Sequence, residues 1–208
     1  MKRKLFVASM LILVVMFSMG AAKKSDEVKR MGIFLSNFTE LGMYEFDLED
    51  SEDDDEILHL GNPNNMSELI RFGIGHNIIN NKKLIQKCTR KNCDYGSSTI
   101  TKEAVAASVK KYFDLNVKHQ DVLGDAPEAE YDGKLYHFDK RNFENDTVYY
   151  CDVQEVNKGK NFVQMEGELY EYGNSKNRIG TFVAKAKPYR YNKKDTWAIL
   201  SFSVTEWY

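Results

Sequence analysis

The sequence is short of the residues and motifs that usually reveal a function. Of its 208 residues, only three are prolines and three are cysteines. It contains no glycine-rich phosphate loop, no His-Glu-x-x-His zinc signature and no Gly-x-Ser-x-Gly nucleophile motif. Apolar residues make up 42% of the chain and charged residues 29%. This balance is typical of folded globular proteins, so a disordered or collagen-like chain is excluded.

The first 22 residues have the pattern of a secretory signal peptide. Three basic residues precede an apolar run over residues 5–20, and small residues follow it up to Ala22. We expect cleavage after Ala22 and an exported protein that is periplasmic, in the cell envelope or secreted. An uncleaved membrane anchor is the alternative, because the 18 residues from 5 to 22 lie at the lower limit for crossing a bilayer.

Hydrophobic periodicity divides the rest of the chain, residues 23–208, into a helical part and a β part, which we expect to form a single α+β domain. Apolar residues recur at helical spacing in three stretches. The first covers residues 25–38, the second runs from Met66 to about Asn80, and the third begins after Thr101, which can cap it. The helical region with an acidic loop spans residues 23–98, and a helix plus the sheet spans residues 99–208.

After Asn116 the apolar period changes to two, which is typical of strands. We expect the N-terminal helices to pack on a C-terminal antiparallel meander of four to five strands. The β-rich runs, separated by turns rich in Gly, Asn and Lys, cover residues 134–138, 147–156, 162–172, 179–189 and 196–207.

Two details of packing also follow from the pattern. The Met66 stretch is predicted to be an amphipathic helix. Its glycines, Gly73 and Gly75, each cost about 1 kcal/mol in a helix relative to alanine, so they indicate close packing or a break in the helix. In the last strand, alternation assigns one face to the core. That face carries Ala198, Leu200, Phe202 and Val204.

The helix and meander from Thr101 to the end resemble the cystatin-like or nuclear-transport-factor-like architecture in their order of elements. Several stretches are also similar to uncharacterised exported bacterial proteins. The resemblance implies export and a single structural unit, but no activity, because such folds serve inhibitors, binding modules and enzymes alike. The stretches are Phe34-Leu35-Ser36-Asn37-Phe38, Glu68-Leu69-Ile70-Arg71-Phe72 with Asn80-Asn81, Lys110-Lys111-Tyr112-Phe113, and Trp197-Ala198-Ile199-Leu200-Ser201.

Nine carboxylates crowd residues 45–56. An EF-hand loop beginning at Asp50 would need glycine at its sixth position and glutamate at its twelfth, where this sequence has Asp55 and Gly61. We therefore expect a solvated, mobile loop without a metal ion. Weak calcium binding by alternating carboxylates is the alternative, and its candidates are Asp50, Glu52 and Asp54.

The odd number of cysteines leaves at least one thiol without a partner in the chain. Only four residues separate Cys88 from Cys93, so we predict a disulfide between them and an ordinary buried thiol at Cys151. The histidines stand singly, which gives no zinc motif, and no cofactor is expected. We expect His76 to be a packed or hydrogen-bonded residue of its helix.

Tyrosines and basic residues concentrate in the last strands. The tyrosines are suited to stacking a sugar or peptide, and the basic run over residues 176–194 is suited to contact with phosphate or an anionic glycan. Tyrosines that simply favour strands, and lysines that only solubilise the surface, are the alternative. No nucleic-acid partner is expected. The candidate ligand-binding residues are Tyr170, Tyr172, Lys185, Lys187 and Tyr189.

These observations favour an exported, non-catalytic binding or interaction module for a protein, peptide or glycan. It would contact a membrane only through an uncleaved signal segment. A small cell-envelope hydrolase is one alternative, which a pocket with two carboxyls or a His–Asp pair would support. The other is an inhibitor of an exported or host hydrolase, which would present a protruding hairpin and no pocket.

Overall fold

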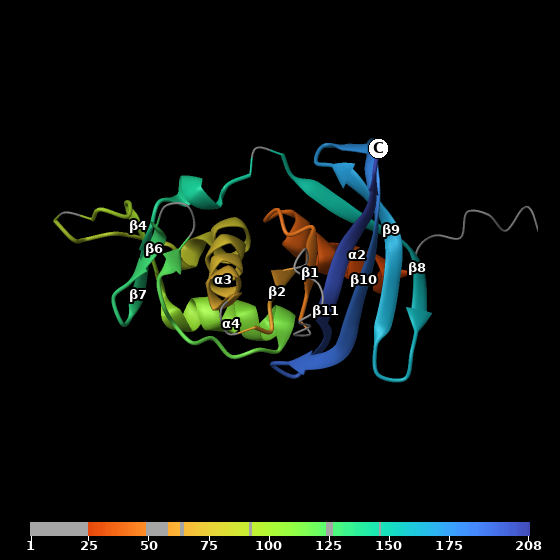
Figure 1. Ribbon diagram of the computed structural model, residues 1–208, viewed down its shortest axis with the longest axis horizontal. Coiled ribbons are helices and arrows are strands. Elements are labelled where there is room, and N and C mark those ends of the chain that lie inside the picture. Colours follow the sequence, from red (N-terminus) through yellow and green to blue (C-terminus); the bar gives the residue numbers. More distant parts are fainter. Residues whose placement is uncertain (1–24, 49–57, 63–64, 92, 124–126, 146) are drawn as a thin grey trace, which may run out of the picture.

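The computed structural model describes residues 25–48, 58–62, 65–91, 93–123, 127–145 and 147–208. Helices α3 (Met66–Asn80) and α4 (Lys102–Phe113) lie between a six-stranded and a five-stranded sheet (Figure 1), and α2 (Asp26–Thr39) packs on the six-stranded sheet. The predicted α+β class is confirmed. No helix in the described ranges is long and apolar enough to cross a membrane. The predicted signal peptide lies outside these ranges.

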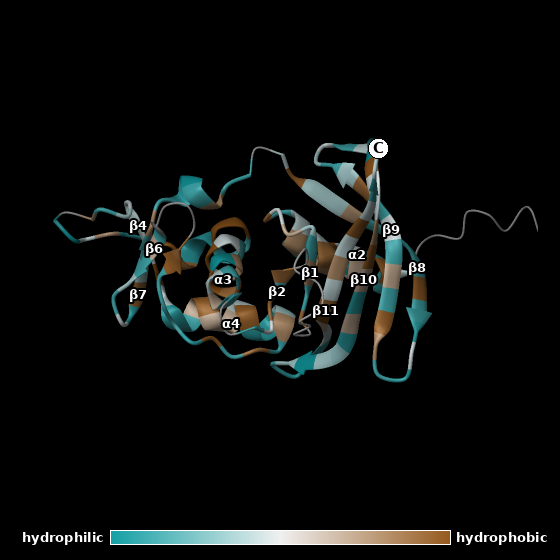
Figure 2. Ribbon diagram, in the orientation of Figure 1, coloured by the Kyte–Doolittle hydropathy of each residue, from teal (hydrophilic) through white to brown (hydrophobic). Residues whose placement is uncertain are grey.

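The six-stranded sheet contains the predicted meander. Its strand order is β2-β1-β11-β10-β9-β8, and the last four strands of the chain pair as antiparallel neighbours. Hydrophobic and hydrophilic residues alternate along these strands (Figure 2), so one face of the sheet is available to the helices. The strands are β1 (Glu45–Asp47), β2 (Leu58–His59), β8 (Tyr149–Lys158), β9 (Val163–Glu171), β10 (Asn174–Tyr191) and β11 (Lys194–Trp207).

The start of the acidic run is a strand and not a loop. Glu45–Asp47 pairs antiparallel with β11, and the buried ring of Phe46 lies opposite Phe202 with ring centroids 6.3 Å apart. Burial of this aromatic side chain fixes the segment despite its carboxylates. The calcium candidates Asp50, Glu52 and Asp54 lie outside the described residues.

The run over residues 134–138 belongs to the second sheet and not to the meander. This sheet has the order β3-β4-β7-β6-β5, and all of its pairs are antiparallel. The two edge strands of this sheet, β3 and β5, have two residues each, which is too short for a periodic pattern to mark them in the sequence. The strands are β3 (Gln86–Lys87), β4 (Ser98–Thr101), β5 (Val122–Leu123), β6 (Pro127–Tyr131) and β7 (Leu135–Phe138).

Of the three α-helices in the described part of the chain, α2 and α4 begin at polar side chains that cap them. The Ser25 hydroxyl accepts a hydrogen bond from the backbone N–H of Val28 at 3.3 Å, and the Thr101 hydroxyl accepts one from Ala104 at 3.2 Å. Each bond satisfies an N–H that has no partner within the helix. The α4 helix ends at Asp114, whose left-handed backbone (φ 56°) turns the chain away.

Helix α3 is buried on two sides rather than amphipathic. Leu69 and Phe72 join the core under the six-stranded sheet, whereas Ile70, Ile74 and Ile78 join the core under the five-stranded sheet. A helix between two sheets must bury both faces. The prediction of one apolar face was wrong because the second sheet was not foreseen.

A β-bulge changes the core face of β11. Lys185 of β10 lies opposite Ser201, but the next residue, Ala186, lies opposite Ile199, so Leu200 is the extra residue. The alternation shifts by one position there. Ala198 and Phe202 are fully buried as predicted, and Val204 packs against the core. Before the bulge, Trp197 and Ile199 also join the core, which was not predicted, whereas Leu200 is only partly buried.

Gly73 lies where α3 meets α4. A Cβ atom on this residue would lie 2.7 Å from Cγ1 and 2.9 Å from the carbonyl oxygen of Val105, whereas one on Gly75 would meet the mobile end of Leu41 at 2.6 Å. We expect Gly73→Ala to lower the free energy of unfolding by about 1–3 kcal/mol, because the backbone of α4 cannot yield. Gly75→Ala has the same gain in helix propensity and should cost less. Equal urea midpoints for the two variants would contradict this packing.

Candidate ligand-binding cleft

A cleft of about 380 Å³ lies between α2 and the edge strand β8. Helix α2 lines it with residues spaced three or four apart, which share one helical face. These include Lys29, Ile33 and Asn37, and Glu40 follows at the end of the helix.

The other sides of the cleft come from α3 and the sheet. Asn80, at the end of α3, lies at the end of the cleft that Asn37 and Glu40 line. The sheet contributes Tyr150 and Asp152 from β8 and Tyr170 from β9.

Helix α2 covers part of the free edge of β8, and this contact fixes the wall of the cleft. The Ser36 hydroxyl accepts a hydrogen bond from the backbone N–H of Cys151 at 3.0 Å, and the Thr39 hydroxyl donates one to the carbonyl of Tyr149 at 2.6 Å. A Cβ on Gly32 would lie 2.8 Å from the Cys151 carbonyl, so only glycine permits this approach. The bonds satisfy backbone groups that an edge strand otherwise exposes.

Glu40 is the central polar group of the cleft. Burial raises the pKa of its carboxyl, although hydrogen bonds from Tyr150 and Asn80 oppose that shift. The Asn80 side chain also donates to Asn37 Oδ1 at 3.4 Å, and the Tyr112 hydroxyl donates to the same oxygen at 3.1 Å. The polar end of the cleft is therefore held in place by a network that continues into the core.

Tyrosine rings form the other side of the cleft. The ring of Tyr150 lies 5.8 Å from that of Tyr170 and 5.5 Å from that of Tyr172, measured between centroids. The Arg178 guanidinium lies over Tyr170 at 5.4 Å and donates to Asp152 at 2.9 Å. Rings held in this way can stack on the apolar face of a ligand, while the nearby carboxylates bind its hydroxyls.

The structure places the five predicted ligand-binding residues in more than one location. Tyr170 lines the cleft and Tyr172 contacts its wall. Lys187 pairs with Asp114 at 2.9 Å, Tyr189 is hydrogen-bonded to the same carboxylate, and Lys185 is exposed opposite Gln164. Glu40, Asn37 and Asn80 were not among the predicted site residues, because no local pattern indicates that α2 packs against a strand more than 100 residues later in the sequence.

Two residues considered for chemistry are structural. Cys151 is buried with Sγ 3.9 Å from Thr39 Oγ1, and burial raises the pKa of its thiol, which makes it a poor nucleophile. His76 is buried between Ser108 Oγ at 3.1 Å and the Tyr112 hydroxyl at 3.2 Å. Burial lowers its pKa to about 4, so the imidazole is neutral, as expected for a packed histidine.

Cys88 and Cys93 are both free thiols and partly buried. They lie between β3 and β4, in the five-stranded sheet, and neither lines the cleft. The disulfide between Cys88 and Cys93 stays a prediction.

Comparisons with protein-family models, with curated proteins and with solved structures find no match to this chain. Its function is inferred from the geometry of its own residues.

Proposed function

We propose that this protein is an exported, non-catalytic binding module that holds a sugar unit of a glycan in the cleft between α2 and β8. The observation that carries the proposal is the meeting of Tyr150 and Tyr170 with Glu40 and Asn80 in one cleft of about 380 Å³. That volume lies within the range of about 300–1,000 Å³ for small-ligand sites.

The chemistry of the lining favours a neutral sugar. A sugar ring offers an apolar face to an aromatic ring and hydroxyl groups to carboxylates and amides. The cleft is lined by two carboxyl groups, Glu40 and Asp152, and one lysine, Lys29, and Arg178 pairs with Asp152 at 2.9 Å. These charges balance, so the cleft has no excess of positive charge that would attract an anionic ligand, including nucleic acid.

Replacing Tyr170 by alanine should weaken glycan binding about tenfold, which corresponds to about 1.4 kcal/mol, because the stacking surface is removed. The mature protein would first be applied to an array of neutral glycans, and the best binder would then be titrated calorimetrically. Tyr191→Ala is the matched control, since Tyr191 lies at the far end of β10 beside Tyr189. Equal losses in both variants, or none in Tyr170→Ala, would show that the sugar binds elsewhere.

A glycan hydrolase is the second candidate because two carboxyl groups, Glu40 and Asp152, line the same cleft. Glycosidases pair one protonated carboxyl with one ionised carboxylate, and burial raises the pKa of Glu40. Glu40→Gln separates the two functions. A binding module releases no sugar from its ligand in either form, whereas a hydrolase loses turnover in the variant and retains binding. The remaining function predicted from the sequence is an inhibitor of an exported or host hydrolase, which would present a protruding hairpin and no pocket.

The proposal of export rests on residues 1–22, whose basic start, apolar run and small-residue end form a signal pattern. The intact mass of protein from the producing cell should correspond to a chain that begins at Lys23. A mass that retains residues 1–22, with the protein in the membrane fraction, would instead support an uncleaved anchor.

A further inference from the structure

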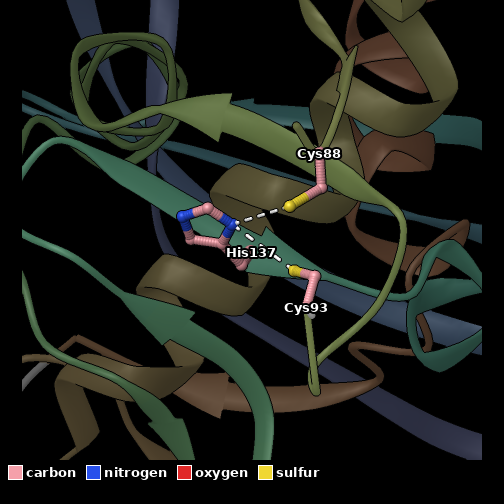
Figure 3. A group of neighbouring side chains, drawn as sticks. All are labelled: Cys88, Cys93 and His137. Atoms are coloured by element: carbon pink, nitrogen blue, oxygen red, sulfur yellow. Dashed lines mark hydrogen bonds between the residues drawn. The ribbon is translucent and has the colours of Figure 1, made fainter. Parts of the chain in front are cut away.

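Two thiols and an imidazole converge in the five-stranded sheet, away from the cleft (Figure 3). Cys88 Sγ lies 3.4 Å from His137 Nδ1, and Cys93 Sγ lies 3.6 Å from the same nitrogen. All three ligand atoms are within 4.8 Å of one another. The cysteines lie between β3 and β4, and the histidine comes from β7.

These distances fit one tetrahedral zinc ion. Bonds of about 2.3 Å to sulfur and about 2.0–2.1 Å to nitrogen, at the tetrahedral angle, separate the two ligand atoms by about 3.5 Å. The single lone pair on Nδ1 accepts one thiol proton, so hydrogen bonding joins only one of the two sulfurs to it directly. A cation between the three atoms would bind both sulfurs and the nitrogen at once. The four residues between the cysteines also match the usual spacing of zinc ligands.

Asp132 holds His137 in the form that a metal requires. Its Oδ2 lies 2.9 Å from His137 Nε2 and 2.8 Å from Arg90 Nη2, while its Oδ1 accepts hydrogen bonds from the backbone N–H groups of Lys134 and Leu135 at 2.9 and 2.7 Å. A fixed carboxylate on Nε2 keeps the proton there and leaves the Nδ1 lone pair directed at the sulfurs. The imidazole itself is buried.

The geometry points to a zinc site formed by Cys88, Cys93 and His137, with water in the fourth position. Two thiolates neutralise the charge of the ion, and Asp132 acts as the positioning residue. The ion ties the β3–β4 loop to β7, so its main effect is to stabilise the five-stranded sheet. This site is independent of the sugar cleft.

The test is a zinc titration of the reduced mature protein against a chromophoric chelator. We expect one ion per chain and a melting temperature that rises with the zinc concentration. Cys93→Ser should weaken binding by about 100-fold or more, because it removes a ligand from a partly exposed position without opening the core. Cys151→Ala is the matched cysteine control and should bind zinc like the wild type.

Two further measurements separate the site from a general effect on folding. Cobalt in place of zinc should give thiolate charge-transfer absorption, which Cys93→Ser reduces. Asp132→Asn should retain that absorption but bind about 10–100-fold more weakly. Reduced wild type that binds zinc no better than Cys93→Ser would overturn the proposal. A Cys88–Cys93 disulfide in the exported protein, together with no zinc uptake after reduction, would also overturn it.

Discussion

Replacing Phe38 by alanine should lower the free energy of unfolding by about 3–5 kcal/mol, the largest effect expected of any substitution considered for this chain. Phe38 is fully buried, and its ring lies 5.3–5.9 Å from five other aromatic rings. These rings come from α2, β1, α3 and α4, so the residue joins elements that are distant in the sequence. They belong to Phe34, Phe46, Phe72, Tyr112 and Phe113.

Urea unfolding of Phe38→Ala, followed by circular dichroism, measures this loss. Phe162→Ala is the matched control, because Phe162 is 40% exposed between β8 and β9 and its removal should change stability by no more than about 0.5 kcal/mol. A cost below about 1 kcal/mol for Phe38→Ala would mean that this ring is not central to the core.

Lowering the pH from 6.5 to 4 should remove about 3 kcal/mol of stability through His76 alone. Burial, with a smaller contribution from the charge of Lys111, lowers the pKa of this imidazole from 6.5 to about 4. Between these values the unfolded chain binds a proton that the folded chain does not. Stability therefore falls as the pH falls, and the loss is complete once the pH is below the pKa of the folded state.

The pH dependence of His76→Gln isolates this contribution. Other groups with shifted pKa values, such as His119, Glu40 and Glu68, are present in both proteins and cancel in the difference. The free energy of unfolding of the wild type should fall by about 3 kcal/mol relative to that of His76→Gln between pH 6.5 and pH 4. Parallel curves across this range would contradict a neutral, buried His76.

The elements that could be predicted from the sequence are those with a strong local signal. The three helices follow from apolar spacing, and the start of α4 also follows from the capping side chain of Thr101. The four-stranded meander follows from long period-two runs. Both patterns arise from residues that are close together in the sequence, so they can be recognised without knowledge of contacts between distant segments.

The remainder depends on contacts between distant segments. Strands β3 and β5 have two residues each, which is too short for any period, so the second sheet was missed and α3 was predicted to bury one face only. The bulge at Leu200 is set by pairing with β10, and it brings Trp197 and Ile199 into the core and leaves Leu200 only partly buried. An extra residue in a ladder has no signature in the strand itself.

The sites were harder to predict than the fold for the same reason. Glu40 meets Tyr150 only because α2 covers the edge of β8, more than 100 residues away in the sequence. His137 stands alone in the sequence and meets Cys88 and Cys93 only through the pairing of β4 with β7. Spacing along the chain indicated a cysteine pair but could not reveal a third ligand.

Sugar binding in the α2–β8 cleft is tested most directly by mapping amide chemical shifts of the labelled mature protein during titration with the neutral glycan that it binds best. We expect the largest changes at Gly32, Asn37 and Tyr150, which line the cleft. Changes confined to the basic part of β10, around Lys185 and Tyr189, would contradict it.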